Sequence, residues 1–222
     1  MEKTCFQKAI LALSLFAFIL STSINVNGSK DYEPDFEYPL NVITHADSTL
    51  NIALRAGDTN EVIASLIQYS IAKSSISEEN VPSVIMRVDS IAAIEKVAST
   101  KAILYSLEAE IYSSYYRKNM YKNRNRDNNT DSIPSDITEW NKEQFSDKIF
   151  SLIKESLIDK KVLQNTLVAT YKGVIEYNEV GAIFRPTIYD FIAYRAMEIL
   201  YQFSDDRPVM LARNSNSSNC DL

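Results

Sequence analysis

The sequence predicts an all-α protein built from antiparallel helical hairpins. Glycine and proline are scarce, with four and six among 222 residues, while 45% of the residues are hydrophobic. Apolar residues recur at helical spacing, and alternating Val-rich runs typical of strands are few. The length suits one domain of ordinary size with tails. We expect a tetratricopeptide- or HEAT-like array of helical pairs packed around a buried C-terminal helix.

The beginning of the chain is typical of a secretory signal. Lys3 and Lys8 precede an apolar run over residues 9–20. This run is too short to cross a membrane, which takes about 20 residues. We therefore expect residues 1–28 to be a signal peptide, with cleavage between residues 23 and 29. An uncleaved anchor is the alternative.

The exported chain would be mildly acidic. Removing Glu2, Lys3 and Lys8 with the signal leaves 21 basic and 28 acidic residues of the original 23 and 29, a net charge of −7. Such a charge argues against nucleic acid as the main partner. Once Cys5 is removed, Cys220 is alone and cannot form an internal disulfide. We expect an exported, periplasmic protein with no stable membrane span after signal cleavage.

Residues 29–39 are predicted to be a polar linker, in which acidic and aromatic residues alternate from Asp31 to Pro39. This pattern suits docking on a partner. It equally suits an extended lead-in that lays Phe36 and Tyr38 on the domain's own surface, and we expect the latter.

The first predicted hairpin joins two helices through a glycine turn. Apolar residues at helical spacing predict a helix over residues 40–56, with Gly57 as its C-terminal stop. Asp58 and Glu61 predict a capping box for a second helix that ends near residue 75. A short turn between two helices makes them antiparallel neighbours.

A second hairpin is predicted from helices over residues 83–98 and 101–118, the latter capped by Ser99 or Thr100. No glycine or proline occurs between residues 83 and 133, so one long helix is also possible. The two hairpins start near residues 40 and 82, and a period of about 40 residues is typical of helical-pair repeats.

One further long helix is predicted over residues 141–158, with Asn141 and Gln144 as its N-terminal box. The remaining connections are shorter and more polar. We expect an irregular segment over residues 119–136 and a polar connection over 159–166. A short helix over 167–177, ending at or before Gly173 or Asn178, and a turn over 179–182 should follow.

The last predicted helix, residues 187–203, is apolar on almost every side, so we expect it to be buried at the centre of the fold. Thr187 and Asp190 form a capping box with Asp in place of Glu, which explains Asp190 without a catalytic role. Arg195 is expected to reach Glu198 on the same helix.

The sequence thus divides into four segments. The end of the chain is rich in serine and asparagine, which is typical of disorder. The segments are a signal peptide (1–28), a linker (29–39), a single α-helical domain (40–203) and a disordered polar tail (204–222).

Residues able to perform chemistry are few and scattered. His45 is the only histidine and Asp47 lies on a different helix face, so neither a metal site nor a histidine triad can be assembled. No phosphate-binding loop or nucleophile elbow occurs. Glu108 and Glu110 fall on different faces of their helix. We expect no catalytic, cofactor-binding or metal-binding residue, no cofactor, and hence no enzyme.

The stretch from Tyr112 to Arg126 mixes tyrosines with cations such as Arg124. One interpretation is a binding site for a polyanion or a glycan. The interpretation we favour is structural, because cations complement the dipole at a helix C-terminus and tyrosines pack with their hydroxyls at the rim.

Three stretches together indicate a family. They are K-A-I-L-Y-S-L-E-A-E-I-Y over residues 101–112 with Tyr115 and Tyr116, D-I-T-E-W-N over 136–141, and R-P-T-I-Y-D-F-I-A-Y-R-A over 185–196. In this order they resemble the N-terminal helical region of the large alpha-2-macroglobulin-like proteins of Bacteroidetes bacteria. The resemblance covers about residues 30–203.

Members of that family continue into β-sandwich macroglobulin domains that trap proteases, and some carry a thioester in a Cys-Gly-Glu-Gln motif. This chain has no such motif, since Cys220 is followed by Asp221 and Leu222. The resemblance therefore implies a truncated or stand-alone helical module without catalytic activity. Such a module would pack against a protein partner or the missing macroglobulin domains.

Two other functions stay open beside the assembly module: a ligand-binding module and an enzyme. Structural features can discriminate among these three functions. A concave pocket ringed by Tyr112, Tyr115 and Tyr194 would favour an independent periplasmic module that binds a peptide or glycan. A buried carboxylate pair in a cleft would favour an enzyme. An exposed apolar patch near the C-terminal end would favour the assembly module.

Overall fold

The structure is a computed structural model that describes residues 34–119, 133–175 and 179–203. Of these residues 81% are helical and none forms a strand, which confirms the all-α prediction. None of the described helices has the length and apolar character needed to cross a membrane. The predicted signal peptide, the polar tail, Arg124 and Arg126 lie outside the described residues.

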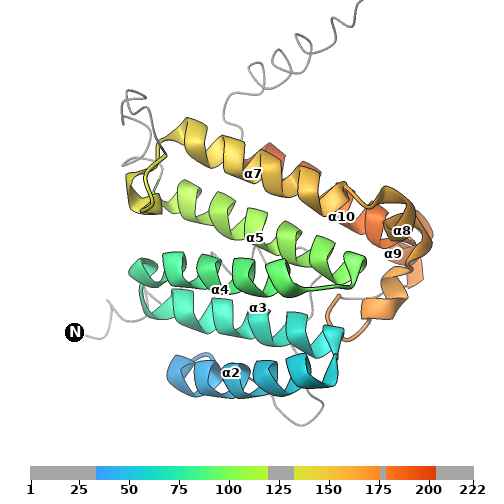
Figure 1. The fold of residues 1–222 in the computed structure, drawn as a ribbon, viewed down its shortest axis with the longest axis horizontal. Helices are drawn as coiled ribbons and strands as arrows, with labels where there is room; N and C mark the ends of the chain where they lie inside the picture. Colours follow the sequence, from blue (N-terminus) through green and yellow to red (C-terminus); the bar gives the residue numbers. More distant parts are fainter. Residues whose placement is uncertain (1–33, 120–132, 176–178, 204–222) are drawn as a thin grey trace, which may run out of the picture.

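The main helices lie side by side in an antiparallel stack, and α10 packs behind α5 and α7 (Figure 1). The stack runs, in order, through α2 (Pro39–Ala56), α3 (Thr59–Ile76), α4 (Val81–Ile94), α5 (Ala98–Lys118) and α7 (Lys142–Leu157), with α10 spanning Ile188–Phe203. Shorter helices complete the described fold: α8 (Lys160–Asn165), α9 (Glu179–Phe184), and the 3-10 helices η1 (Glu78–Asn80), η2 (Ile137–Glu139) and η3 (Val168–Tyr171). The antiparallel succession agrees with the predicted hairpins, while a tetratricopeptide- or HEAT-like repeat stays a prediction.

Local signals placed the first hairpin correctly. Gly57 ends α2 with a φ of 71°, in the left-handed region that glycine adopts without a Cβ penalty. The Asp58 carboxylate caps α3 by accepting a hydrogen bond from the Glu61 N–H at 3.1 Å. Only half of the predicted box forms, because the Glu61 carboxylate accepts from the Ser65 hydroxyl instead.

The other two predicted capping boxes are complete. Asn141 and Gln144 each accept a hydrogen bond from the other's backbone N–H, at 3.0 and 2.9 Å, at the start of α7. At the start of α10, the Thr187 hydroxyl accepts from the Asp190 N–H while the Asp190 carboxylate accepts from the Thr187 N–H. Asp190 therefore has the capping role predicted for it.

The predicted boundaries of the second hairpin need correction. A single long helix is wrong, because Glu95 is extended and its carboxylate accepts the N–H groups of Lys96 and Val97 at 2.7 Å, separating α4 from α5. Neither Ser99 nor Thr100 caps α5. Their hydroxyls bond instead to the Tyr171 hydroxyl, at 2.7 and 2.9 Å, which ties η3 to the start of α5.

The segment before α10 also differs from the prediction. The expected connection over residues 159–166 contains α8, and the expected turn over 179–182 belongs to α9. The short helix predicted over 167–177 is realised over the described residues as the 3-10 helix η3, and Leu167 just before it pairs with Thr187 in an isolated antiparallel bridge. The flanking backbone bonds, Val168 N–H to Pro186 O at 3.0 Å and Ile188 N–H to Thr166 O at 2.9 Å, fix the start of α10.

The centre of the fold is α5 and not the C-terminal helix, so this part of the fold prediction is wrong. Every residue of α5 from Ala102 to Tyr116 is buried except Tyr105, which is half-buried. By contrast, Met197 and Tyr201 of α10 are 62% and 64% exposed. The reason is position: α5 has α4, α7 and α10 around it, whereas α10 lies against α5, α7 and α8 on one side only.

Phe191 tests the packing of α10 on α5. It is buried, so replacing it with alanine should lower the free energy of unfolding by about 3–5 kcal/mol through lost burial and a residual cavity. The matched control is Met197→Ala on the exposed side of α10, expected to change stability by less than about 0.5 kcal/mol. Urea unfolding of both variants measures this, and equal losses would contradict the placement of α10.

Candidate functional site

The side of α5 that meets α10 holds a buried ion pair. Glu110 and Arg195 are both buried, and their carboxylate and guanidinium are in direct contact. Arg195 also donates from Nε to the Ser106 hydroxyl at 3.3 Å. The predicted partner of Arg195 on its own helix, Glu198, is thus replaced by a residue of another helix.

The opposite side of α5 holds a second buried carboxylate. Glu108 is fully buried, and the Nζ atom of Lys148 on α7 lies 3.3 Å from its Oε1 atom. The same Nζ atom lies 5.5 Å from the centre of the Tyr112 ring. Burial raises the pKa of Glu108 to about 7; Asp89 on α4 raises it further, and Lys148 lowers it. Burial and the nearby Glu108 charge also raise the pKa of Tyr112.

These two carboxylates do not form a catalytic pair. As predicted, Glu108 and Glu110 face different ways, one toward α7 and the other toward α10. Each is matched by its own cation, and Glu108 is fully buried, so no shared proton site results. Removing one member of a buried ion pair is strongly destabilising. The arrangement therefore explains these charges by their role in holding α7 and α10 on α5.

The three tyrosines proposed to ring a binding pocket are divided between the core and the surface. Tyr112 and Tyr115 are buried against the ring of Phe145, which anchors α7 on α5. Tyr194 is exposed on α10. A hollow between α3, α4 and α5 does exist near Leu107, but its volume is about 30 Å³. Ligand pockets are typically about 300–1,000 Å³.

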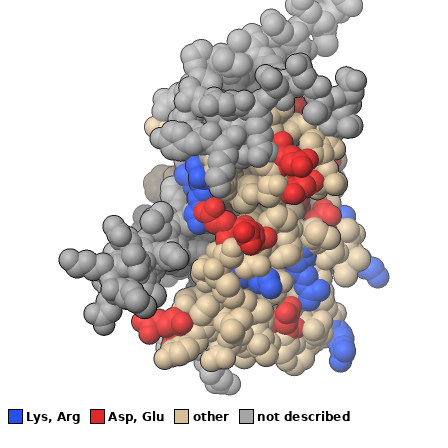
Figure 2. All heavy atoms as spheres, turned by 90° about the vertical axis from the view of Figure 1, so that its left-hand side faces the viewer, with Lys and Arg blue, Asp and Glu red and all other residues tan. Residues whose placement is uncertain are grey.

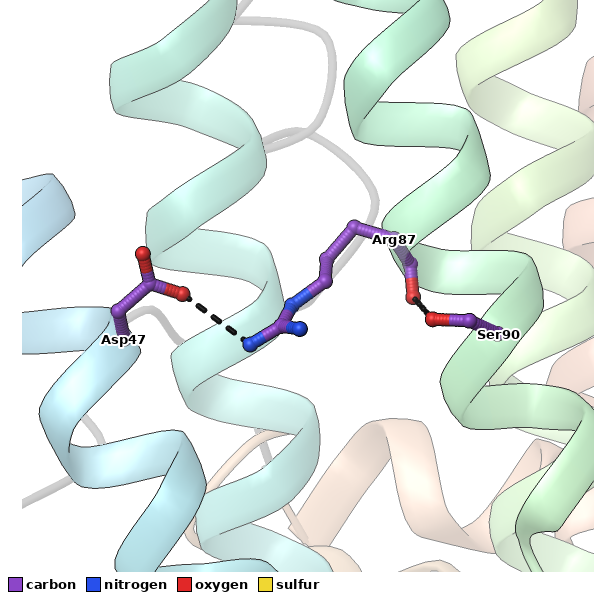
Figure 3. A network of polar contacts seen from close by, with 3 residues as sticks. All are labelled: Asp47, Arg87 and Ser90. Atoms are coloured by element: carbon purple, nitrogen blue, oxygen red, sulfur yellow. Dashed lines mark hydrogen bonds and ion pairs between the residues drawn. The ribbon is translucent and has the colours of Figure 1, made fainter.

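Polar contacts elsewhere on the surface are modest. Arg87 of α4 reaches across α3 to Asp47 of α2, with 3.3 Å between Nη2 and Oδ1 (Figure 3). The Ser90 hydroxyl donates to the Arg87 carbonyl oxygen. Exposed ion pairs of this kind contribute little to stability. His45 Nδ1 lies 3.5 Å from the Thr49 hydroxyl, and no set of metal-ligating side chains gathers within the described ranges.

Acidic and basic side chains are interspersed on the end of the stack formed by the start of α4 and the end of α5 (Figure 2). There Lys118 pairs with Glu78 at 3.8 Å. Burial lowers the pKa of Lys118, and Glu78 acts in the opposite direction. Neither sign of charge dominates the described part of this face.

An exposed apolar surface lies at the other end of the chain, near the C-terminus. Tyr194, Met197 and Tyr201 follow the i, i+3, i+7 spacing that places side chains on one side of a helix, and all three are exposed. Ile183 and Phe184, at the end of α9, are 75% and 77% exposed. We refer to these five residues as the α9–α10 face.

Arg185 joins the two parts of the α9–α10 face. It follows α9 directly, and its guanidinium carbon lies 4.1 Å from the centre of the Tyr194 ring on α10. An arginine stacked on a tyrosine is a cation–π pair. The sequence did not indicate the residues of the α9–α10 face, because aromatic residues at helical spacing look the same in a sequence whether they are exposed or buried.

The lead-in to α2 is exposed as well. Residues 35–38 form a turn in which the Tyr38 N–H donates to the Asp35 carbonyl and the Glu37 N–H donates to the Asp35 carboxylate, both at 3.0 Å. Tyr38 is 61% exposed and Phe36 is just over one-third exposed. The expectation that both rings would lie on the domain's own surface is therefore wrong for Tyr38.

Comparisons with protein-family models, curated proteins and solved structures find no match for this chain. The resemblance to the helical region of alpha-2-macroglobulin-like proteins therefore stays a prediction carried by the three stretches described above.

The raised pKa of Glu108 predicts a pH-dependent stability. The folded protein holds the Glu108 proton up to pH about 7, whereas the unfolded chain releases it near 4.5. Stability from this group is therefore complete below pH 4.5 and is lost as the pH rises through about 7. The difference corresponds to about 3 kcal/mol.

Unfolding of wild type and Glu108→Gln between pH 4 and pH 8 measures this effect. The wild type should lose stability between pH 4 and pH 8 as Glu108 ionises, whereas Gln at this position does not titrate. The stability of the variant relative to wild type should therefore be higher at pH 8 than at pH 4. Glu155→Gln, on the exposed side of α7, is the matched control and should follow wild type throughout. A constant difference between Glu108→Gln and wild type across the range would refute the raised pKa.

The Glu110–Arg195 pair predicts a strong asymmetry between single and double variants. Glu110→Met should lower the free energy of unfolding by about 3–5 kcal/mol, because Arg195 keeps a buried charge without its carboxylate. Glu110→Met combined with Arg195→Met should recover most of that loss, since apolar residues of similar volume can replace a buried pair. A double-mutant cycle by urea unfolding measures both, and additive losses would contradict the coupling.

Proposed function

We propose that this chain is an exported, non-catalytic helical module that acts by packing against another protein through the α9–α10 face. The observation that carries the proposal is the exposure of Met197 and Tyr201 along α10 and of Ile183 and Phe184 at the end of α9. Contiguous exposed apolar surface on a soluble protein marks a site of interaction.

The composition of the α9–α10 face is that of an interface core. Aromatic residues, methionine and arginine are enriched at such cores, whereas lysine and the acids are depleted. Tyr194, Met197, Tyr201 and the stacked Arg185 supply these types. Tyrosine and arginine are also the residues most often found as binding hot spots.

The opposite side of α10 is held firmly, which favours a preformed surface. Arg195 is anchored in the Glu110 pair, and Ile192 is fully buried. The Leu167–Thr187 bridge fixes where the helix begins. A helix fixed on its inner side presents its outer side chains with little ordering cost on binding.

The other two functions have less support. Two of the tyrosines proposed to ring a ligand pocket are buried against Phe145 while Tyr194 is exposed, and the hollow between α3, α4 and α5 is too small for a peptide or a glycan. The buried carboxylates are matched by Lys148 and Arg195. The resemblance adds one candidate partner for the assembly module, the macroglobulin domains that follow the helical region in that family.

Cysteine protection tests whether the α9–α10 face is covered in the native setting. In a Cys5→Ser/Cys220→Ser background, Met197→Cys places a single thiol on the face, and Met86→Cys places one on α4, where Met86 is similarly exposed. We expect a thiol reagent to modify Cys at position 197 at least about tenfold more slowly in the native cells than in dilute purified protein. Position 86 should react at similar rates in both.

Equal rates at position 197 in the two settings would exclude a covered α9–α10 face and with it the proposed function. Circular dichroism of both purified variants confirms that the helical fold is intact, so that slow modification reflects cover by a partner.

A further inference from the structure

We infer that the partner of the α9–α10 face is a second copy of this chain, whose lead-in at residues 35–38 docks on it. The inference rests on the proposed function and names the occupant of the same face. Two exposed surfaces of opposite character on one chain carry it: the lead-in is acidic and aromatic, and the α9–α10 face is apolar and bordered by an arginine.

The charges of the two surfaces are complementary. Asp35 and Glu37 are the acidic residues of the lead-in, and neither forms an ion pair within the described part of the chain. The same holds for Arg185, whose guanidinium contacts the Tyr194 ring. Arginine and a carboxylate form the strongest charge-assisted hydrogen bonds available to protein side chains.

The apolar parts of the two surfaces also match. Phe36 and Tyr38 present aromatic rings from the lead-in, while Met197 and Tyr201 present a thioether and a ring from α10. Aromatic pairs and sulfur–aromatic contacts each contribute beyond the area they bury. The turn held by the Asp35 carboxylate fixes the backbone between the two rings, so they are displayed together.

The lead-in cannot reach the α10 part of the α9–α10 face of its own chain. It is attached to the start of α2, which lies at one end of the stack, whereas α7 and α10 lie at the other (Figure 1). Three successive helix spacings of about 8–10 Å separate α2 from α5, the helix against which α10 packs. Residues 34–38 span at most about 18 Å when fully extended.

Contact between two different surfaces is head-to-tail. Each copy then keeps one free lead-in and one free α9–α10 face, so further copies add until the assembly closes into a ring or extends as a filament. This predicts a behaviour that a symmetric pairing of two α10 helices cannot show: two variants, each broken at a different surface, restore one contact when mixed.

Light scattering after size exclusion, under reducing conditions that exclude a Cys220 disulfide, tests this on the full chain. Wild type should exceed the mass of one chain as concentration rises. Phe36→Ser, which breaks the lead-in, and Met197→Asp, which breaks the face, should each stay at one chain. An equimolar mixture of the two should give twice the mass of one chain and go no further.

Three outcomes would overturn the inference: wild type of one-chain mass at all concentrations, a mixture of variants that stays at one chain, or loss of assembly in Met197→Asp alone. The last would indicate α10-to-α10 pairing. Wild type of one-chain mass together with a protected position 197 in cells would leave the proposed function standing with a different partner.

Exchanging the charges of Glu37 and Arg185 tests whether these two residues pair between copies of the chain. Glu37→Arg and Arg185→Glu should each weaken association about tenfold. The double variant should recover most of the wild-type affinity, because the exchanged charges again attract. Asp35 is left unchanged, since its carboxylate holds the turn. Failure of the double variant to recover would overturn the Glu37–Arg185 contact.

Discussion

The need to match charge inside the stack constrains the rest of this structure. Two carboxylates of the central helix α5, Glu108 and Glu110, are removed from water, and each is matched by a cation from a different neighbour. A buried charge without a partner would cost several kcal/mol, so α7 must present Lys148 and α10 must present Arg195 at those positions. Buried pairs of this kind often add little net stability over apolar residues of similar volume, whereas loss of one member is strongly destabilising.

The sequence was sufficient wherever the deciding interaction is local. Asn141 with Gln144, Thr187 with Asp190, and Gly57 after α2 are signals contained within a few residues, and the structure has each of them. Predictions of helix boundaries and caps were less accurate where residues far away in the sequence determine the local structure. The helix predicted over 167–177 is a short 3-10 helix that follows the bridge between Leu167 and Thr187, and the Tyr171 hydroxyl bonds to the side chains expected to cap α5.

The exposure of the candidate site could not be predicted from the sequence either. Apolar content suggested that α10 is the centre of the fold, whereas the serines and glutamates of α5 hid the fact that α5 is the most buried helix. Phe191 faces the core while Met197 faces solvent, although both are large apolar residues on one helix. The sequence does not indicate which apolar side of α10 packs against the other helices. Arg195 finds its partner 85 residues away, beyond what helical spacing can reveal.

The distance along the chain between Glu110 and Arg195 also orders the assembly of the fold in time. During synthesis at about 5–20 residues per second, α5 is complete several seconds before residue 195 exists. The α2–α3 hairpin closes a short loop, whereas this ion pair closes a long one, and long loops form later. Until α10 arrives, Glu110 must stay hydrated. The side of α5 that later packs against α10 is thus exposed to solvent during synthesis.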